Sequence, residues 1–199
     1  MDAVLSYNLT DLVPFGPETY HRLFARLNAA LWPGPLLLPL VGAGLVVLAW
    51  RAPRGAGRVT AGALGLAWLW VGWDVLLGRF GPLLWAAPYA AALVWIQGAA
   101  MLLAGALAGA TPARRGPSVG HGLGLLLALA GVVAWPLSAP LSGRPWIQAE
   151  VVGLAPDPTA LLTLGLLLMA GGRVRWGLMV IPVVWLALST AVHVAMAQV

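Results

Sequence analysis

The residue of this chain best placed to do chemistry is Asp157. It stands in residues 153–170, where the run Pro156-Asp157-Pro158-Thr159 comes directly before an uninterrupted apolar stretch. Asp157 is a good helix N-cap, and Pro158 suits the first helical position, where no backbone N–H is needed. A carboxylate beside free N–H groups at a helix start can bind an ion or a polar solute. The alternative interpretation is an ordinary N-cap in a connecting loop.

Two other polar side chains stand inside apolar runs. Asp74 follows Trp68-Leu69-Trp70-Val71-Gly72-Trp73, and a carboxyl group there is costly unless it is paired, protonated or in contact with water. Asp74 is therefore a candidate binding residue, with a pairing to Arg79 as the alternative. Gln97 is the second candidate, although a buried amide more often hydrogen-bonds between packed helices.

Glu150, Thr159 and Asn28 complete the candidate binding residues. We expect Asp157 to cap its helix below the outer membrane surface and to line the same polar pocket as Asp74. Glu150 is predicted on the same side of the membrane as both of these carboxylates.

Catalysis and metal binding have little support in the sequence. The chain has no cysteine, and His21, His121 and His193 lack the spacing of metal ligands. Ser189 and Thr190 have no adjacent general base, and no phosphate-binding or dinucleotide-binding glycine motif occurs. An enzyme is therefore the least favoured class, no catalytic residue is assigned, and metals and cofactors are left unassigned.

Composition indicates an integral membrane protein. The mean hydropathy is +0.90, 61% of the residues are hydrophobic and only 9% are charged, which exceeds what the core of a soluble domain needs. The net charge of +5 comes from arginine alone, since lysine is absent. The arginines lie mainly in short loops between apolar runs, where they set topology, so nucleic acid is not an expected partner.

The apolar runs predict an all-α, polytopic protein with one domain over residues 1–199. We expect a six-helix transmembrane bundle with spans at about residues 34–50, 59–78, 82–110, 122–139, 156–172 and 176–196. Pro136 and Pro140 should bend the fourth span or end it early. The fifth helix is only about 15 residues, or roughly 22 Å, long after Pro158, whereas a hydrocarbon core is roughly 30 Å thick. Either residues 149–155 complete the crossing or the helix starts below the membrane surface.

Residues 17–31 predict an amphipathic helix that lies in the membrane interface rather than across it. Tyr20, Leu23, Phe24, Leu27 and Leu31 recur at helical spacing, and polar residues take the other positions. We expect this helix to lie roughly parallel to the membrane with its apolar face on lipid or on the end of the bundle. The deeper tryptophans are expected to pack against lipid and neighbouring helices.

Arginine counts in the loops predict the orientation. The loops after the first, third and fifth spans hold seven arginines: Arg51, Arg54, Arg58, Arg114, Arg115, Arg173 and Arg175. The other side holds four: Arg22, Arg26, Arg79 and Arg144. We therefore expect a multi-pass protein of the bacterial cytoplasmic (inner) membrane with both termini outside the cytoplasm.

Three segments resemble the DUF6064 family of bacterial membrane proteins, whose function is unknown. Residues 24–33 (FARLNAALWP) resemble its Asn-x-x-x-Trp-Pro motif, and residues 153–159 (GLAPDPT) resemble its Gly-x-Ala-Pro-x-Pro-Thr motif. Residues 181–185 (IPVVW) are similar to its last span. The resemblance runs from about Tyr20 to Val194 and implies a polytopic fold without supplying a catalytic residue.

Two functions agree with these observations. The first is a transporter or channel for a cation, a proton or a small polar solute, with a carboxylate site that faces the outside. The second is a non-catalytic membrane subunit or scaffold that binds a partner complex, lipid or quinone. The lipid bilayer is an expected partner in both cases, and a homo-oligomer or a larger membrane complex is compatible with either. The spans show no clear internal repeat, a feature of many transporters.

Overall fold

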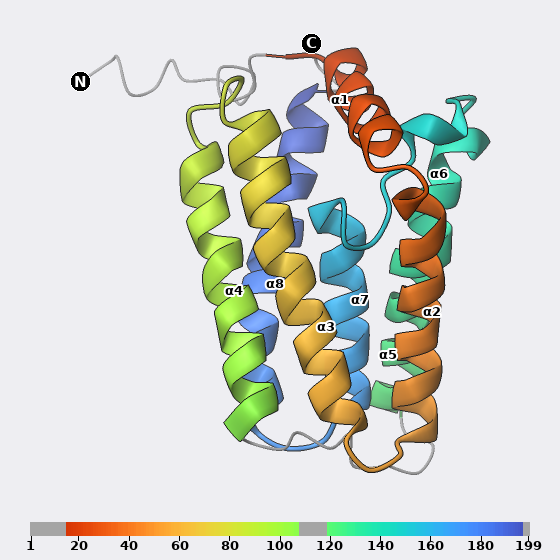
Figure 1. The fold of residues 1–199 in the computed structure, drawn as a ribbon, viewed down its shortest axis with the longest axis vertical. Helices are drawn as coiled ribbons and strands as arrows, with labels where there is room; N and C mark the ends of the chain where they lie inside the picture. Colours follow the sequence, from red (N-terminus) through yellow and green to blue (C-terminus); the bar gives the residue numbers. More distant parts are fainter. Residues whose placement is uncertain (1–14, 108–118, 197–199) are drawn as a thin grey trace.

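A computed structural model describes residues 15–107 and 119–196 of the chain, and within these ranges the regular elements are helical (Figure 1). The elements are α1 (Pro17–Ala30), α2 (Gly34–Arg51), α3 (Ala56–Trp70), the π-helix η3 (Val71–Phe80), α4 (Ala87–Leu107), α5 (Val119–Leu129), the π-helix η4 (Ala130–Ala134), α6 (Trp135–Leu141), the short 3-10 helix η5 (Trp146–Gln148), α7 (Pro156–Met169) and α8 (Val174–Met196). The all-helical prediction is confirmed.

Within the described residues, five continuous helices are long and apolar enough to cross a membrane. They are Gly34–Arg51, Ala56–Phe80, Ala87–Leu107, Val119–Leu141 and Val174–Met196. The fifth predicted span corresponds to α7, which has only 14 residues. The fourth does not end early at its prolines: the π-helical segment η4 precedes Pro136, and the helix continues to Leu141. A π turn before a proline accommodates the missing hydrogen-bond donor without breaking the helix.

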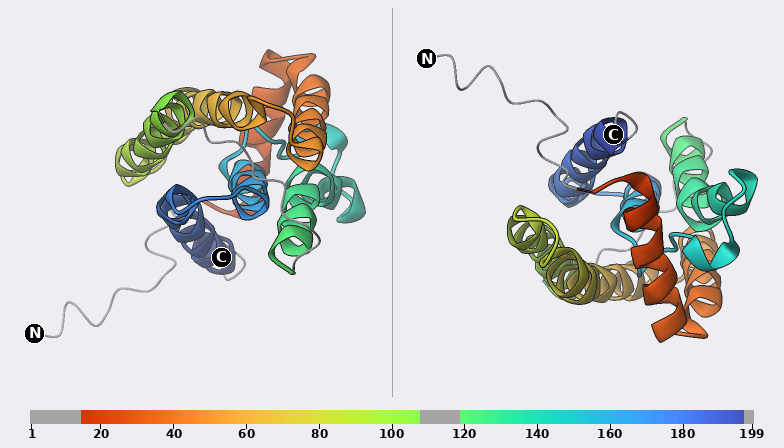
Figure 2. Two further views of the ribbon diagram at one scale, coloured as in Figure 1. Left: turned by 90° about the horizontal axis from the view of Figure 1, so that it is seen from below. Right: turned by 90° about the horizontal axis from the view of Figure 1, so that it is seen from above.

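The short helix α7 forms the centre of the bundle. Seen along the bundle axis, it lies among α2, α3, α5 and α8 (Figure 2), and all but two of its residues are buried. Glycines allow the closest approach: a Cβ at Gly165 would lie 2.5 Å from the backbone of Gly124 and of Ala128. Because α7 is enclosed by other helices, it can be short and apolar on all sides.

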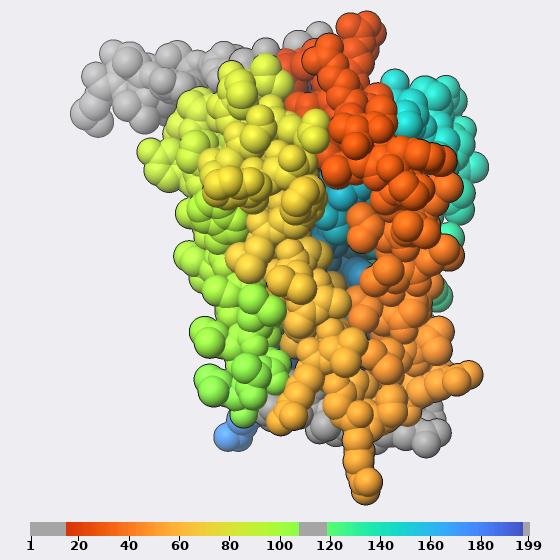
Figure 3. All heavy atoms as spheres, in the orientation of Figure 1, coloured from red at the N-terminus to blue at the C-terminus, as the bar shows by residue number. Residues whose placement is uncertain are grey.

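The first turn of α7 lies inside the bundle. Residues 149–155 are a non-helical, largely buried segment that leads from η5 to it and turns at Gly153 and Leu154, and this region is visible in a hollow between α2 and α3 (Figure 3). Two details differ from the prediction. Ala155 is the N-cap, and Asp157 is the second residue of the helix and makes no capping bond. Because Pro156 and Pro158 have no N–H, the turn also offers fewer free donors than we expected.

Asn28 and Thr159 hold this buried segment in place. The Asn28 amide nitrogen donates to the carbonyls of Ile147 and Ala149, each at 2.8 Å. The Thr159 hydroxyl accepts from the Gly153 N–H at 2.8 Å and donates to the Ala155 carbonyl at 2.6 Å. Backbone groups in an apolar interior need such partners, so both candidate binding residues have structural roles here.

Helix α1 lies across one end of the bundle, which we call the α1 end (Figures 1 and 2). Its Tyr20, Leu23, Phe24 and Leu27 are buried, as the helical spacing predicts. They join a core cluster that includes Trp68, Val75 and Phe80 of the second long helix and Ala195 of α8. The C-terminal part of α8 reaches the same end, whereas the α2–α3 and α7–α8 connections lie at the opposite end (Figure 1).

Candidate functional site

Asp157 is bound by two side chains of α8. Trp185 Nε1 donates to Asp157 Oδ1 at 2.7 Å, and the Ser189 hydroxyl donates to Asp157 Oδ2 at 2.7 Å. The carboxylate is only 1% exposed. Each oxygen thus receives one short hydrogen bond, and each has a further lone pair with which it can accept a bond from a ligand.

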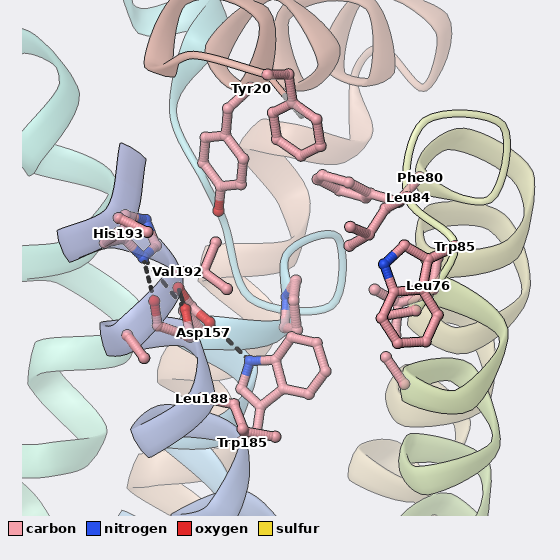
Figure 4. A pocket seen from close by; sticks show the side chains of 18 of the residues that line it. Tyr20, Leu76, Phe80, Leu84, Trp85, Asp157, Trp185, Leu188, Val192 and His193 are labelled. Carbon is pink, nitrogen blue, oxygen red and sulfur yellow. Dashed lines mark hydrogen bonds between the residues drawn. The ribbon is translucent and has the colours of Figure 1, made fainter. Parts of the chain in front are cut away.

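His193, one turn further along α8, continues this network (Figure 4). Its Nδ1 lies 2.8 Å from the Ser189 carbonyl oxygen and 3.3 Å from the Ser189 hydroxyl oxygen. A carbonyl oxygen can only accept, so Nδ1 carries a hydrogen, and the Ser189 hydroxyl donates its own hydrogen to Asp157. The imidazole is therefore not arranged to remove the Ser189 proton, and these three residues do not form a nucleophilic triad.

Asp157, Ser189 and His193 lie at one side of a cavity of about 390 Å³ at the α1 end. Most of its wall is apolar or aromatic, and Figure 4 shows Phe80 and Trp85 across the cavity from Asp157, with Tyr20 close to His193. The lining residues are Phe15, Tyr20, Phe24, Leu76, Phe80, Leu84, Trp85, Ala86, Ala87, Ala90, Pro156, Asp157, Trp185, Leu188, Ser189, Ala191, Val192, His193 and Ala195. The cavity reaches the molecular surface at Trp85, which is 68% exposed.

A second buried carboxylate, Glu150, lies next to this cavity. It belongs to the segment that leads into α7 and is 6% exposed. Glu150 Oε2 accepts from the Tyr20 hydroxyl at 3.0 Å and from Trp135 Nε1 at 3.3 Å. Burial first, and then the negative charge of Asp157, raise the pKa of the Glu150 carboxyl above its ordinary value. Tyr20 thus connects Glu150 with the cavity, because its ring lines the wall.

Neither carboxylate is neutralised by a basic side chain. Among the residues that the structure describes, the salt bridges are Arg22–Glu18 and Arg79–Asp74. Within the same ranges, no three histidine, aspartate or glutamate side chains gather as a metal site. A buried charge without a partner is expensive, so Asp157 and Glu150 together favour a bound cation, a bound proton or both.

Asp74 does not share this site. Arg79 Nε donates to Asp74 Oδ2 at 3.0 Å, and Asp74 does not line the cavity of Asp157. The pair is five residues apart in the π-helix η3, whose wider turns bring such residues together. The predicted pocket shared by Asp74 and Asp157 is therefore wrong, and the alternative pairing with Arg79 is correct. Glu150 does not line the cavity either, but its carboxylate is connected with the cavity wall through Tyr20.

Gln97 lies elsewhere, between α4 and α8. Its Nε2 donates to the Leu178 carbonyl at 3.0 Å, as expected of an amide that joins packed helices. A Cβ at the adjacent Gly98 would lie 2.9 Å from the Gly65 carbonyl oxygen. Gln97 also lines a separate apolar groove between α4 and α8, which the Asp157 cavity does not include.

A family model for DUF6064, described as a family of unknown function, matches residues 17–198. The chain belongs to the DUF6064 family. The match covers α1, the segment that leads into α7, and all the residues of the Asp157 network. A search of curated proteins and of solved structures gives no match.

The sequence of this DUF6064 protein did not lead us to the partners of the two carboxylates. We expected Trp135 and Trp185 only to pack, whereas each donates its N–H to a buried carboxylate. One signal was present: Trp185, Ser189 and His193 are spaced at i, i+4 and i+8, so they share one face of α8. A polar stripe on an otherwise apolar helix indicates a buried partner.

Proposed function

We propose that the protein is an integral membrane protein that binds a small organic cation with an apolar body and carries it across the bacterial cytoplasmic membrane. One observation carries the proposal. A buried carboxylate, Asp157, lies in the wall of an apolar, aromatic cavity, and no basic side chain of the described residues forms an ion pair with it.

The lining of the cavity suits this class of ligand. Its volume of about 390 Å³ is within the range of small-molecule sites. The carboxylate attracts the positive group, and the remaining lone pairs accept hydrogen bonds from an ammonium group. Aromatic rings attract a cation through their faces, and the wall holds six phenylalanine, tyrosine and tryptophan side chains: Phe15, Tyr20, Phe24, Phe80, Trp85 and Trp185. The apolar remainder of the wall matches a hydrocarbon body.

The architecture supports transport rather than binding alone. Broken or short helices whose first turns lie inside a bundle are a common way to build transporter sites. Helix α7 has this form, since it begins inside the bundle and is preceded by a buried non-helical segment. In the orientation predicted from the arginines, the cavity opens toward the outside.

Binding of benzyltrimethylammonium to the purified protein in lipid nanodiscs tests the proposal. Its neutral isostere, neopentylbenzene, has nearly the same shape without the charge. We expect the cation to bind and the isostere to bind at least about tenfold more weakly, because the attraction of the quaternary ammonium charge to desolvated aromatic faces contributes about 2 kcal/mol, in addition to its attraction to Asp157. Asp157→Asn should remove the preference for the cation, since it keeps an acceptor oxygen and loses the charge.

Asp74→Asn is the matched control, because Asp74 pairs with Arg79 outside the cavity. It should leave the affinity for benzyltrimethylammonium unchanged. Liposomes that contain the protein should accumulate the cation, whereas Asp157→Asn liposomes should not. Equal binding of cation and isostere, with no effect of Asp157→Asn, contradicts the proposal.

The second candidate is a membrane subunit that binds a neutral quinone or a lipid chain. The observation in its favour is the almost wholly apolar wall of the cavity. A neutral short-chain quinone that binds more tightly than benzyltrimethylammonium, in both the wild type and Asp157→Asn, would select this function.

A further inference from the structure

We propose that Glu150 is the proton-exchange group of the cavity: it holds a proton while the cavity is empty and releases that proton when an organic cation binds beside Asp157. This inference rests on the proposed function. It adds a coupled movement of one proton for each cation bound.

The position of Glu150 is the first support. Its carboxyl group is buried, and it lies on the segment that enters the first turn of α7, seven residues before Asp157. The Tyr20 hydroxyl donates to it while the Tyr20 ring forms part of the cavity wall. A positive charge in the cavity therefore acts on Glu150 across one aromatic side chain.

The hydrogen bonds of Glu150 leave a place for a proton. Tyr20 and Trp135 donate to the same oxygen, Oε2, so a proton on Oε1 disturbs neither bond. Burial and the nearby Asp157 charge raise the pKa of Glu150, and two negative charges this close favour the state with one proton. A cation in the cavity offsets the negative charge of Asp157. It therefore lowers the pKa of Glu150 and favours the ionised form of its carboxyl group.

Of the other titratable groups around Glu150, Tyr20 and His21 do not supply this proton, and the variant His193→Gln distinguishes His193 from Glu150. On α1, burial raises the pKa of Tyr20 well above its usual value, so its hydroxyl keeps its hydrogen. Also on α1, burial, followed by the charges of Arg144 and His193, lowers the pKa of His21 to about 4, so His21 holds no extra proton in neutral solution. On α8, His193 Nδ1 donates to the Ser189 carbonyl. On α7, each Asp157 oxygen accepts one hydrogen bond.

The exchange balances without a further reactant. In the empty protein, Asp157 is a carboxylate and Glu150 is a neutral carboxylic acid. A quaternary ammonium ion enters, the O–H bond of Glu150 breaks, and the proton passes to water. The two carboxyl groups together carry a charge of −1 in the empty site and −2 in the occupied site. The ligand adds +1 to the occupied site, so both states have the same net charge.

Proton release on addition of benzyltrimethylammonium, followed with a pH-indicator dye in weakly buffered solution, tests the inference. This probe is a permanent cation, so every proton that appears comes from the protein. We expect release to approach about one proton per cation bound, and the affinity to rise by up to about tenfold per pH unit where release is greatest. At higher pH, where Glu150 is already ionised in the empty protein, the affinity should become constant.

Glu150→Gln should bind the cation with an affinity independent of pH and release no proton, because the amide oxygen still accepts from Tyr20 and Trp135. Glu18→Gln is the matched control: this α1 carboxylate is exposed and paired with Arg22, and its loss should leave proton release unchanged.

Trp135→Phe is a second variant, outside the cavity lining. It removes a bond that favours the ionised Glu150, so the pH at which affinity rises should shift upward.

The outcomes separate the two proposals. Failure of the wild type to bind the cation overturns the proposed function. Binding without proton release overturns only the role of Glu150. Proton release that persists in Glu150→Gln and is lost in His193→Gln also overturns it and assigns the proton to His193.

Discussion

At the scale of single residues, the two carboxylates depend on tryptophan N–H groups. Trp185 and Trp135 each place one donor on a carboxylate oxygen in an interior with few other polar groups. Indole is suited to this, because it combines a large apolar surface with a single donor and no acceptor. The carboxylates are thereby held in position without the basic partner that would neutralise them. The site keeps its negative charge available for a ligand.

Removing the donors of Asp157 should destabilise the protein. Trp185→Phe and Ser189→Ala each leave one carboxylate oxygen without its bond, and each should reduce the free energy of unfolding by about 1–2 kcal/mol. The double variant should lose less than the sum, since both residues act on the same group. Denaturant unfolding in mixed micelles measures these changes. Trp146→Phe, at an exposed position on η5, is the control, and a loss there equal to that of Trp185→Phe would contradict the assigned role of the indole N–H.

At the scale of elements, the site exists because α7 is short and closely surrounded. The glycine contact between α5 and α7 brings the two backbones together, and the Asn28 and Thr159 bonds fix the segment above. Together they fix where α7 begins, and therefore the depth of Asp157. A helix that ran through to the α1 end would fill the space that the cavity occupies.

Gly165→Ala tests this packing. The added Cβ would lie 2.5–2.7 Å from backbone and side-chain atoms of α5, so α7 must move. We expect a loss of about 1–3 kcal/mol of stability, as for an overpacked core, and weaker cation binding as Asp157 shifts. Gly62→Ala in α3 is the matched control: nothing lies within 4 Å of its Cβ, and alanine favours a helix over glycine by about 1 kcal/mol. Equal melting temperatures for the two variants would show that the α5–α7 contact does not constrain α7.

Local patterns predicted the elements well and the contacts between them poorly. The apolar spacing of α1 identified Tyr20, Phe24 and Leu27 as its buried face, because that face follows from helical geometry alone. The partners of Asp157 lie 28 and 32 residues away. They depend on how α8 is rotated about its axis, which no local pattern specifies.

The error at Asp74 has a similar physical reason. We placed it with Asp157 because it lies near the outer end of its helix, on the same side of the membrane. From Val71 onward the helix is a π-helix with more residues per turn, which brings Asp74 to Arg79, and depth along the helix alone does not predict that pairing. Glu150 could be included as a candidate only from its charge and its predicted side of the membrane, because the irregular segment that holds it has no periodic pattern.

At the scale of the whole molecule, the acidic side chains lie toward one end of the bundle. Among the described residues, Glu18, Asp74, Glu150 and Asp157 all belong to the half of the bundle that carries α1 (Figure 1). The connections at the other end hold arginines and no acidic residue within the described ranges. The α1 end also holds Arg22, Arg26, Arg79 and Arg144, so the described charges there balance, whereas the opposite end carries an excess of positive charge that would repel cations.

This distribution leads to a prediction for the orientation in the membrane. Positively charged loops stay in the cytoplasm, so the α2–α3 and α7–α8 connections should be cytoplasmic and the α1 end should face the outside. The chain has no cysteine, so single cysteines can be introduced without background labelling. Ser142→Cys, exposed near the α1 end, should react with a membrane-impermeant maleimide on intact cells. Pro53→Cys, exposed in the α2–α3 connection, should react only after the cells are permeabilised. The reverse pattern would place Asp157 and its cavity on the cytoplasmic side, and the proposed carrier would then load its cation from within the cell.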